Sequence, residues 1–376
     1  MPGDGERGTV VRLAPPYPNL STLSGASEIC LRVEGAPDPR QLANALGHLG
    51  PRGPVLAEDG SLLLRDRLER LQEAVRELGA APQPPEPVQA LWDALQRLGA
   101  PAPALRLGRT VWEFGERTYL LGVVNVTPDS FSGDGVGASP EAAVARAQRL
   151  VGEGADAIDL GGESTRPGHA PVSAREELGR VLPALRLLAE EIPVPILVDT
   201  NKAEVARAAL AAGAHGVNDI WGLRGDPEMA GVVAEAQVPV ICMHNQEGHQ
   251  YADLLGGVQA GLRASLRLAE RAGIQREQVV LDPGIGFGKV PAQNFEVLRR
   301  LCELRVLGCA LLVGTSRKSL IGWLLDERPA EGRLLGTAAT VAWSVANGAD
   351  IVRVHDVAQI RDVTRVIDAL SRRPPG

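Results

Sequence analysis

The sequence lacks the features that tie a chain to a membrane, to nucleic acid or to an oxidising compartment. No uninterrupted apolar stretch reaches the roughly 18 residues of a membrane span. The 39 Lys and Arg residues are outnumbered by 46 Asp and Glu, and a net charge of −7 argues against a general nucleic-acid or membrane-surface binder. Only four cysteines occur, without C-x-x-C pairing, so we expect reduced, buried thiols. The amino terminus also lacks a secretory signal, and we expect a cytoplasmic protein.

Lysine is scarce as well, since only Lys202, Lys289 and Lys318 stand among the 39 cationic residues. A lysine ammonium is a compact point charge and an arginine guanidinium a planar fork, so a site shaped for one is poorly served by the other. Each lysine follows a short apolar run, which makes all three candidates for a functional site. Lys202 has a second interpretation, as an exposed residue at the start of a helix.

Eight short apolar runs are present from residue 120 onward, and each is followed by a segment long enough for a crossover helix. They span residues 120–124, 157–160, 196–199, 216–219, 240–243, 279–282, 311–314 and 351–354. Runs that are apolar on both faces are typical of a buried parallel sheet. Eight such units predict an α/β protein with a (β/α)8 TIM barrel over residues 109–376, and an open doubly wound sheet is the alternative.

The region before the barrel has a different pattern. Residues 1–108 contain a predicted strand at 28–33 and helical patterns at 39–49, 64–78 and 87–98. They predict a small α+β appendage, in which we find no catalytic constellation.

Polar side chains gather where the predicted strands end, the face that carries the active site in TIM-barrel enzymes. One group is Asp199, Asn218 and Asp282. Its carboxylates and amide suit a ligand edge rich in N–H donors, such as a 2-amino-4-oxo-pyrimidine ring, whose oxo group a lysine such as Lys318 can meet.

A second group supplies cationic and neutral donors. It comprises Arg166, Arg353 and His355 with Asn125 and Thr165. Arginine forks match phosphate oxygens, and Mg²⁺ takes one or two protein oxygens while keeping several waters. This group therefore predicts a phosphate site that can include a metal ion.

A glycine-rich segment, residues 284–288, follows the sixth run. It matches neither a Walker loop nor a dinucleotide-binding fingerprint, so it is either a plain connection or a loop that brings Phe287 over a flat ligand. Phe131 and Phe287 are two of only four phenylalanines, and both lie in predicted loops. We favour stacking of Phe287 on an aromatic substrate.

Long motifs in this order resemble the dihydropteroate synthase family. The matching segments are residues 122–132, 159–168, 282–289, 316–319 and 353–356, within a resemblance that covers about residues 110–370. Two positions depart from the family pattern: Asp134 stands one place later than the usual loop acid, and Asn245 stands where methionine is frequent.

The resemblance implies condensation of 6-hydroxymethyl-7,8-dihydropterin pyrophosphate with p-aminobenzoate, giving 7,8-dihydropteroate and pyrophosphate in folate biosynthesis. It places the pterin against Asp199, Asn218, Asp282 and Lys318, and pyrophosphate against Asn125, Thr165, Arg166, Arg353 and His355, with Mg²⁺ held partly by Asn125. It places the aminobenzoate near Phe131, Pro167, Phe287 and Ser319. It assigns catalysis to Arg166, Lys318, Arg353 and His355. It also implies that the protein is a homodimer and a target of sulfonamides.

Two other functions remain open at this point. A pterin-dependent methyltransferase on a related barrel would keep the acidic pterin contacts but has less use for Arg166, Arg353 and His355. A non-catalytic pterin-binding protein would not need both a phosphate site and a second aromatic pocket.

Overall fold

The computed structural model describes residues 9–14, 28–47, 53–80, 84–127, 139–163 and 172–372. It divides into two compact units, the first made of Met1–Ala102 with Arg300–Gly308 and the second of Pro103–Arg299 with Cys309–Gly376. The sequence-based boundary after residue 108 differs from this division. A hairpin of β5 (Leu105–Leu107) and β6 (Thr110–Trp112) belongs to the second unit, and a 3₁₀ segment of the later chain, η3 (Leu301–Leu307), belongs to the first.

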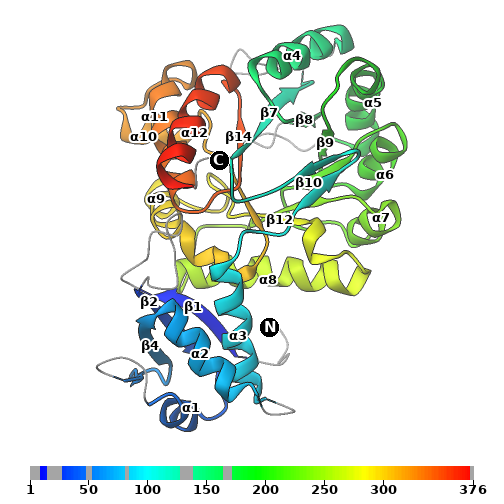
Figure 1. Ribbon diagram of the computed structural model, residues 1–376. Coiled ribbons are helices and arrows are strands. Elements are labelled where there is room, and N and C mark those ends of the chain that lie inside the picture. Colours follow the sequence, from blue (N-terminus) through cyan, green and yellow to red (C-terminus); the bar gives the residue numbers. More distant parts are fainter. Residues whose placement is uncertain are drawn as a thin grey trace. The chain divides into compact units, whose positions relative to one another are not determined.

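The second unit is a closed barrel of eight parallel strands, in which β14 pairs with β7 to complete the ring (Figure 1). The strands are β7 (Tyr119–Asn125), β8 (Ala157–Gly161), β9 (Ile196–Asp199), β10 (Gly216–Asp219), β11 (Val240–Met243), β12 (Val279–Asp282), β13 (Ala310–Val313) and β14 (Ile351–Val354). The closure confirms the TIM barrel and excludes the open sheet.

Helices form the outer layer around these strands (Figure 1). They are α4 (Pro140–Glu153), α5 (Ala174–Glu191), α6 (Ala203–Ala211), α7 (Met229–Ala236), α8 (Leu254–Ala272), α9 (Pro291–Arg299), α10 (Ser319–Leu324), α11 (Leu334–Ala346) and α12 (Val357–Ser371), with short 3₁₀ turns η2 (Arg276–Gln278) and η4 (Ala330–Arg333). No helix among the described residues is long and apolar enough to cross a membrane.

Local chemistry accounts for these elements. The side chain of Ser139 accepts a hydrogen bond from the Ala142 N–H and so caps α4, which has a proline in its first turn. Gly154 and Gly273 end α4 and α8 in the left-handed conformation that glycine adopts without strain. Strands such as β9 and β11 are buried along their whole length, as expected for a sheet covered on both faces. All four cysteines are buried, which confirms that part of the expectation.

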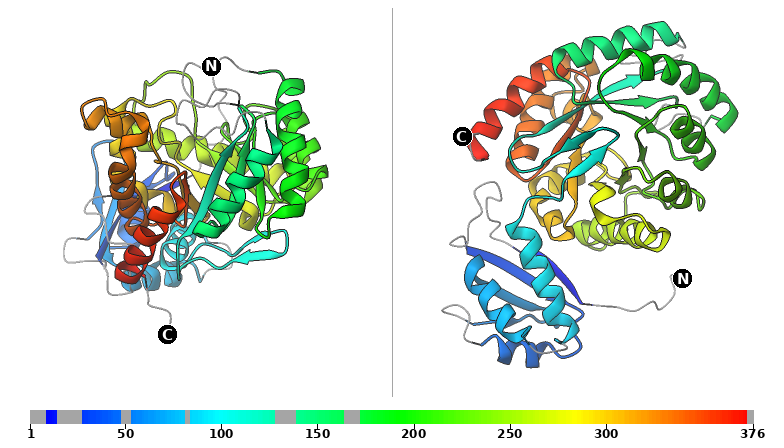
Figure 2. Two further views of the ribbon diagram at one scale, coloured as in Figure 1. Left: turned by 90° about the horizontal axis from the view of Figure 1, so that it is seen from above. Right: turned by 45° about the vertical axis from the view of Figure 1, so that its right-hand side comes forward.

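The first unit is the small α+β appendage. Its antiparallel sheet has the order β1-β2-β4-β3, from β1 (Val10–Ala14), β2 (Glu28–Glu34), β4 (Leu62–Arg67) and β3 (Val55–Leu56). Three helices accompany the sheet: α1 (Pro39–Ala45), α2 (Leu68–Leu78) and α3 (Glu86–Gly99). Of these, α2 contacts β4 and α3 contacts β1, and Figure 2 shows both helices beside the sheet.

One secondary-structure prediction in this unit is wrong. Residues 64–67, predicted as the start of a helix, belong to β4, and α2 begins only at Leu68. Burial alternates along β4, and the strand pairs with β2 from Leu62 to Arg67. The leucines of β4 therefore follow the two-residue period of a strand.

Candidate active site

Arg353 lies at the centre of the polar cluster at the carboxyl ends of the barrel strands. Its Nε donates to Asp159 Oδ2 at 2.5 Å, and its Nη2 donates to Asp199 Oδ2 at 2.7 Å. Asn218 Nδ2 donates to the same Asp159 oxygen at 3.0 Å. The structure thus brings together Asp199, Asn218 and Arg353, although the sequence assigned Arg353 to a separate phosphate group.

The charges in this cluster are tightly balanced. Burial raises the pKa of Asp199 to about 7, and Asp159 adds to the rise while Arg353 opposes it. Burial works to lower the pKa of Arg353, but the two carboxylates outweigh it and the net shift is upward. Arg353 therefore stays charged and stabilises the ionised form of Asp199.

The same cluster holds unused hydrogen-bond acceptors. Oδ1 of Asp159 and Oδ1 of Asp199 are buried, and neither has a hydrogen-bond partner among the described residues. A buried carboxylate oxygen without a donor costs free energy, and N–H groups of a bound ligand would recover it.

Asp282, at the end of β12, interacts electrostatically with the lysine Lys318. Its Oδ1 accepts the Gly284 N–H at 2.7 Å. Lys318 Nζ donates to the carbonyl of Ile285 and lies 4.6 Å from the centre of the Phe287 ring. Burial lowers the pKa of Lys318 to about 8, while the charge of Asp282 opposes that shift. Lys318 is thus a cation that burial makes easier to deprotonate, and it lies beside an aromatic ring.

Lys289, in contrast, is buried beneath the loop after β12. Its Nζ lies 3.1 Å from His244 Nδ1 and donates to the carbonyls of Gly284 and Phe287, each at 3.0 Å. Burial lowers the pKa of Lys289 to about 7, and burial together with the charge of Lys289 lowers the pKa of His244 to about 3. His244 is neutral, so it accepts from Lys289, and the three acceptors match the three protons of an ammonium group.

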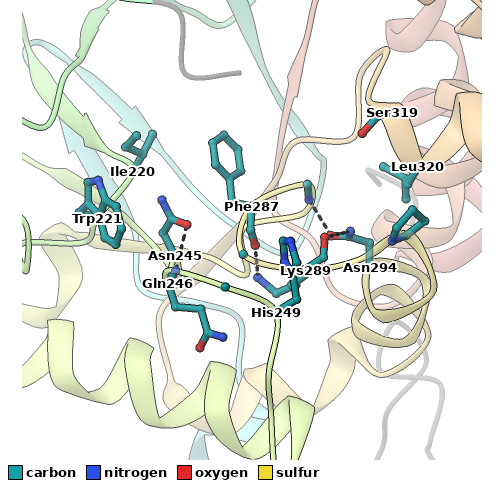
Figure 3. A pocket seen from close by; sticks show the side chains of 14 residues that line it. Ile220, Trp221, Asn245, Gln246, His249, Phe287, Lys289, Asn294, Ser319 and Leu320 are labelled. Atoms are coloured by element: carbon teal, nitrogen blue, oxygen red, sulfur yellow. Dashed lines mark hydrogen bonds between the residues drawn. The ribbon is translucent and has the colours of Figure 1, made fainter. Parts of the chain in front are cut away.

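A pocket of about 340 Å³ lies along this loop. Figure 3 shows the Phe287 ring standing between Ile220 and Trp221 on one side and Ser319 and Leu320 on the other. The half-buried ring of Phe287 and the apolar side chains opposite it make a slot suited to a flat aromatic ligand.

His355 and Asn125 stand at the ends of adjacent strands. The Nδ1 of His355 lies 3.0 Å from Ser316 Oγ, which also accepts the backbone N–H of His355 at 3.2 Å. On β7, Asn125 is paired in register with Gly161 of β8. A Cβ at Gly161 would lie 3.1 Å from Asn125 Oδ1 and 3.8 Å from Asp199 Oδ2. Glycine therefore leaves the space beside these two side-chain oxygens open.

Lys202 is not the exposed helix residue that one interpretation gave. Its Nζ pairs with Glu163 and, at 2.5 Å, with Glu177, whose side chain is fully buried. Glu163 Oε1 also accepts the Val172 N–H at 3.1 Å. Lys202 thus has a structural role at the base of the β8–α5 connection.

The remaining candidates cannot be placed. Phe131, Asp134, Thr165, Arg166 and Pro167 lie outside the described residues.

Sequence reasoning gave no role to several residues of the cluster. Asp159 interrupts an otherwise apolar strand, and an acid inside a buried strand is a signal that could have identified it. The partners of Lys202 and Lys289 carried no such signal, because they come from distant parts of the chain.

Known proteins share this barrel. A family model described as "Pterin binding enzyme" matches residues 121–355. Among curated proteins, a dihydropteroate synthase of Synechocystis is 47% identical over 277 residues, covering 72% of this chain and 96% of that protein. One from Bacillus subtilis is 46% identical over 257 residues, covering 68% and 90%.

Solved structures agree with these relatives. A Clostridium difficile dihydropteroate synthase determined with pteroic acid has a TM-score of 0.67 and 48% identity, covering 70% of this chain and all of that one. A Xanthomonas albilineans dihydropteroate synthase with 4-aminobenzoic acid has a TM-score of 0.68 and 42% identity, covering 73% and 100%. A Yersinia pestis enzyme in a sulfonamide complex has a TM-score of 0.68 and 38% identity, covering 71% and 98%.

Proposed function

The chain belongs to the pterin-binding enzymes and, among them, to the dihydropteroate synthases, and from this we propose the residue roles by which its barrel mouth works. The reaction is a transfer that joins dihydropterin pyrophosphate to p-aminobenzoate in folate biosynthesis. The similarity to these relatives decides against the two alternatives, a pterin-dependent methyltransferase and a non-catalytic pterin-binding protein.

Asp199, Asn218, Asp282 and Lys318 form the proposed pterin site. The observation that carries this proposal is the buried Oδ1 of Asp199, which has no donor among the described residues and can accept N–H groups of the pterin edge. Lys318 supplies the matching donor for the oxo group, since it is a half-buried cation beside Asp282.

Arg353 and His355 are the proposed ligands of the pyrophosphate, together with Thr165 and Arg166 of the β8–α5 connection. Arg353 links the two ends of the substrate, because it is held by the pterin-site carboxylate Asp199. Cationic and neutral donors aimed at a leaving anion stabilise the charge that develops as the C–O bond breaks.

Asn125 is the proposed protein ligand of Mg²⁺. No cluster of three or more His, Cys, Asp or Glu that could hold a metal occurs in the described part of the chain. The amide oxygen of Asn125 beside the glycine-lined space still fits an ion that takes one protein oxygen and completes its shell with water and phosphate. Bound there, Mg²⁺ would neutralise charge on the departing pyrophosphate.

The aminobenzoate is proposed to lie against Phe287 and Ser319, and the family resemblance adds Phe131 and Pro167. Support comes from the slot in which the Phe287 ring stands (Figure 3). This role places the attacking amine next to the pterin held by Lys318.

Calorimetric titration of a free dihydropterin into the Asp282→Asn variant tests the pterin site. The amide retains an acceptor for the Gly284 N–H but carries no charge, so we expect affinity to fall about tenfold or more. Asp156→Asn, at the opposite end of the barrel strands, is the control and should bind normally. Equal affinity in both variants would remove Asp282 from the pterin site.

We also propose a homodimer and a cytoplasmic location. The location is supported by four free, buried cysteines, which suit a reducing compartment. Sedimentation analysis and cell fractionation test the two statements.

A further inference from the structure

Arg317 has an unusual backbone and lies between Ser316, which contacts His355, and the candidate site residue Lys318. Its φ angle is +58°, in the left-handed region that side-chain-bearing residues rarely adopt. Such a conformation costs free energy and persists only where the surroundings over-determine it.

Three contacts hold Arg317 in this conformation. Its backbone N–H donates to Thr337 Oγ1 at 3.0 Å, and its carbonyl accepts from Arg333 Nη1 at 2.9 Å. Its guanidinium forms a two-pronged ion pair with Asp356, with Nε to Oδ2 at 3.0 Å and Nη2 to Oδ1 at 2.5 Å. Both side chains of this pair are only 16% exposed. A paired fork in this geometry fixes orientation as well as charge.

The ion pair joins two loops that carry different parts of the site. Lys318 follows Arg317 in the loop after β13, and His355 precedes Asp356 in the loop after β14. The same loops meet one residue earlier, where Ser316 Oγ contacts the N–H and the Nδ1 of His355. Two consecutive cross-loop contacts make the separation between the two loops rigid.

We propose that the Arg317–Asp356 ion pair is a positioning device that sets the separation between Lys318 and His355. Neither Arg317 nor Asp356 touches the substrate in this proposal, which rests on the proposed roles of Lys318 at the pterin and His355 at the pyrophosphate. One substrate molecule spans both residues, and the bond that breaks lies between them. A fixed separation therefore holds the two ends of that bond in the reactive geometry.

The prediction that follows distinguishes the linked substrate from its parts. Free pterin or free pyrophosphate needs only one of the two loops, so its affinity should hardly depend on the ion pair. The pterin pyrophosphate ester needs both loops at once, so kcat/KM for the ester should fall about ten- to a hundredfold when the pair is broken.

The test is a double-mutant cycle with Arg317→Gly, Asp356→Asn and the double variant, in the full-length chain. Glycine accepts a φ of +58° without strain, so the first variant removes the guanidinium while sparing the backbone. We expect each single variant to reduce kcat/KM for the ester, with the double variant no worse than the singles, because two partners of one contact act as a unit. Titrations of free pterin and of pyrophosphate should stay within about threefold of the original chain.

A matched control exists at the other end of the barrel. Arg117 and Asp156 form a similar two-pronged pair, with contacts of 3.1 and 2.8 Å. Arg117→Gly and Asp156→Asn should alter thermal stability but leave kcat/KM unchanged.

Three outcomes would overturn the proposal: unchanged kcat/KM in folded variants, additive losses in the double variant, or equal losses for the ester and for its free parts. If Asp356→Asn does not fold, Arg317→Gly alone tests the proposal. The comparison is then between its kcat/KM for the ester and its affinities for free pterin and for pyrophosphate. Failure of the original chain to form dihydropteroate would instead refute the proposed function.

Discussion

At the scale of single residues, Arg353 is the side chain that connects the most charged groups of the candidate site. It compensates two buried carboxylates, Asp159 and Asp199, and it also stands among the residues proposed for pyrophosphate. A cation with both tasks couples the ionisation of the pterin site to the binding of the leaving group.

Arg353→Ala should therefore weaken both the free pterin and its pyrophosphate ester, each by about tenfold or more. Removal of the guanidinium leaves Asp159 and Asp199 facing each other without a counter-charge, which disfavours the ionised form of Asp199, the form proposed to accept the pterin. Calorimetric titration of both ligands measures this, with Arg117→Ala as the control. Loss of ester affinity with normal pterin affinity would show that Arg353 serves the phosphate alone.

Lys289 gives a prediction about pH. Its pKa in the folded chain is lowered from 10.5 to about 7, chiefly by burial, so between these values the unfolded chain binds more protons than the folded one. The stability that Lys289 contributes therefore rises with pH across this window and is lost as the pH falls through about 7. The free energy of unfolding of the original chain, minus that of Lys289→Met, should increase from about pH 7 to pH 10.

Urea unfolding across that pH range is the measurement, and Lys202→Met is the control. The pKa of Lys202 is raised; burial opposes this rise, but its bonds to Glu163 and Glu177 outweigh that effect. Its contribution is therefore constant below 10.5 and lost only at higher pH. If the difference in the free energy of unfolding between the original chain and Lys289→Met did not change with pH, the lowered pKa of Lys289 would be wrong.

The residue types of the site could be predicted from the sequence, whereas their pairing could not. Asp199, Asn218 and Asp282 end apolar runs, so their position at one face followed from the strand pattern. The contact of Arg353 with Asp159 joins residues 194 positions apart and depends on the closure of the barrel. Periodicity carries no information on such long-range pairs.

At the scale of elements, the turn after β12 depends on glycine. Gly284 has a φ of +68°, and a Cβ there would lie 1.9 Å from the carbonyl oxygen of His244. The turn presents its N–H to Asp282 and its carbonyl to Lys289. A displaced turn would thus disturb the candidate pterin site directly.

Gly284→Ala should lower the free energy of unfolding by more than Gly273→Ala does and should weaken pterin binding as well. Gly273 has a φ of +88° with open space around it, so alanine there adds only backbone strain of about 1–2 kcal/mol. Urea unfolding and pterin titration of both variants distinguish backbone strain, which both variants have, from the collision with His244, which only Gly284→Ala has. Similar losses of stability with normal binding would show that the turn tolerates a side chain.

Element type followed the sequence best where the pattern was long. The eight barrel strands were predicted because each is short, apolar and buried on both faces. The leucines of β4 misled the prediction because they run directly into α2 without a turn residue between the two elements.

At the scale of the whole molecule, the barrel was predictable and the division into units was only partly so. Eight alternating units favoured a closed barrel over an open sheet, and the strand pairing shows that the barrel is closed. The assignment of η3 to the first unit required the fold. This segment follows α9 in the barrel but contacts α3 (Glu86–Gly99) and β1 (Val10–Ala14), which come much earlier in the chain.

The most direct test of the central claim is the complete reaction. Purified full-length chain is supplied with dihydropterin pyrophosphate and Mg²⁺, with and without p-aminobenzoate, while pyrophosphate and dihydropteroate are followed together. We expect dihydropteroate to form with equimolar release of pyrophosphate, in a reaction that depends on p-aminobenzoate and is slower in the Arg353→Ala variant. Tight pterin binding without dihydropteroate would contradict this expectation.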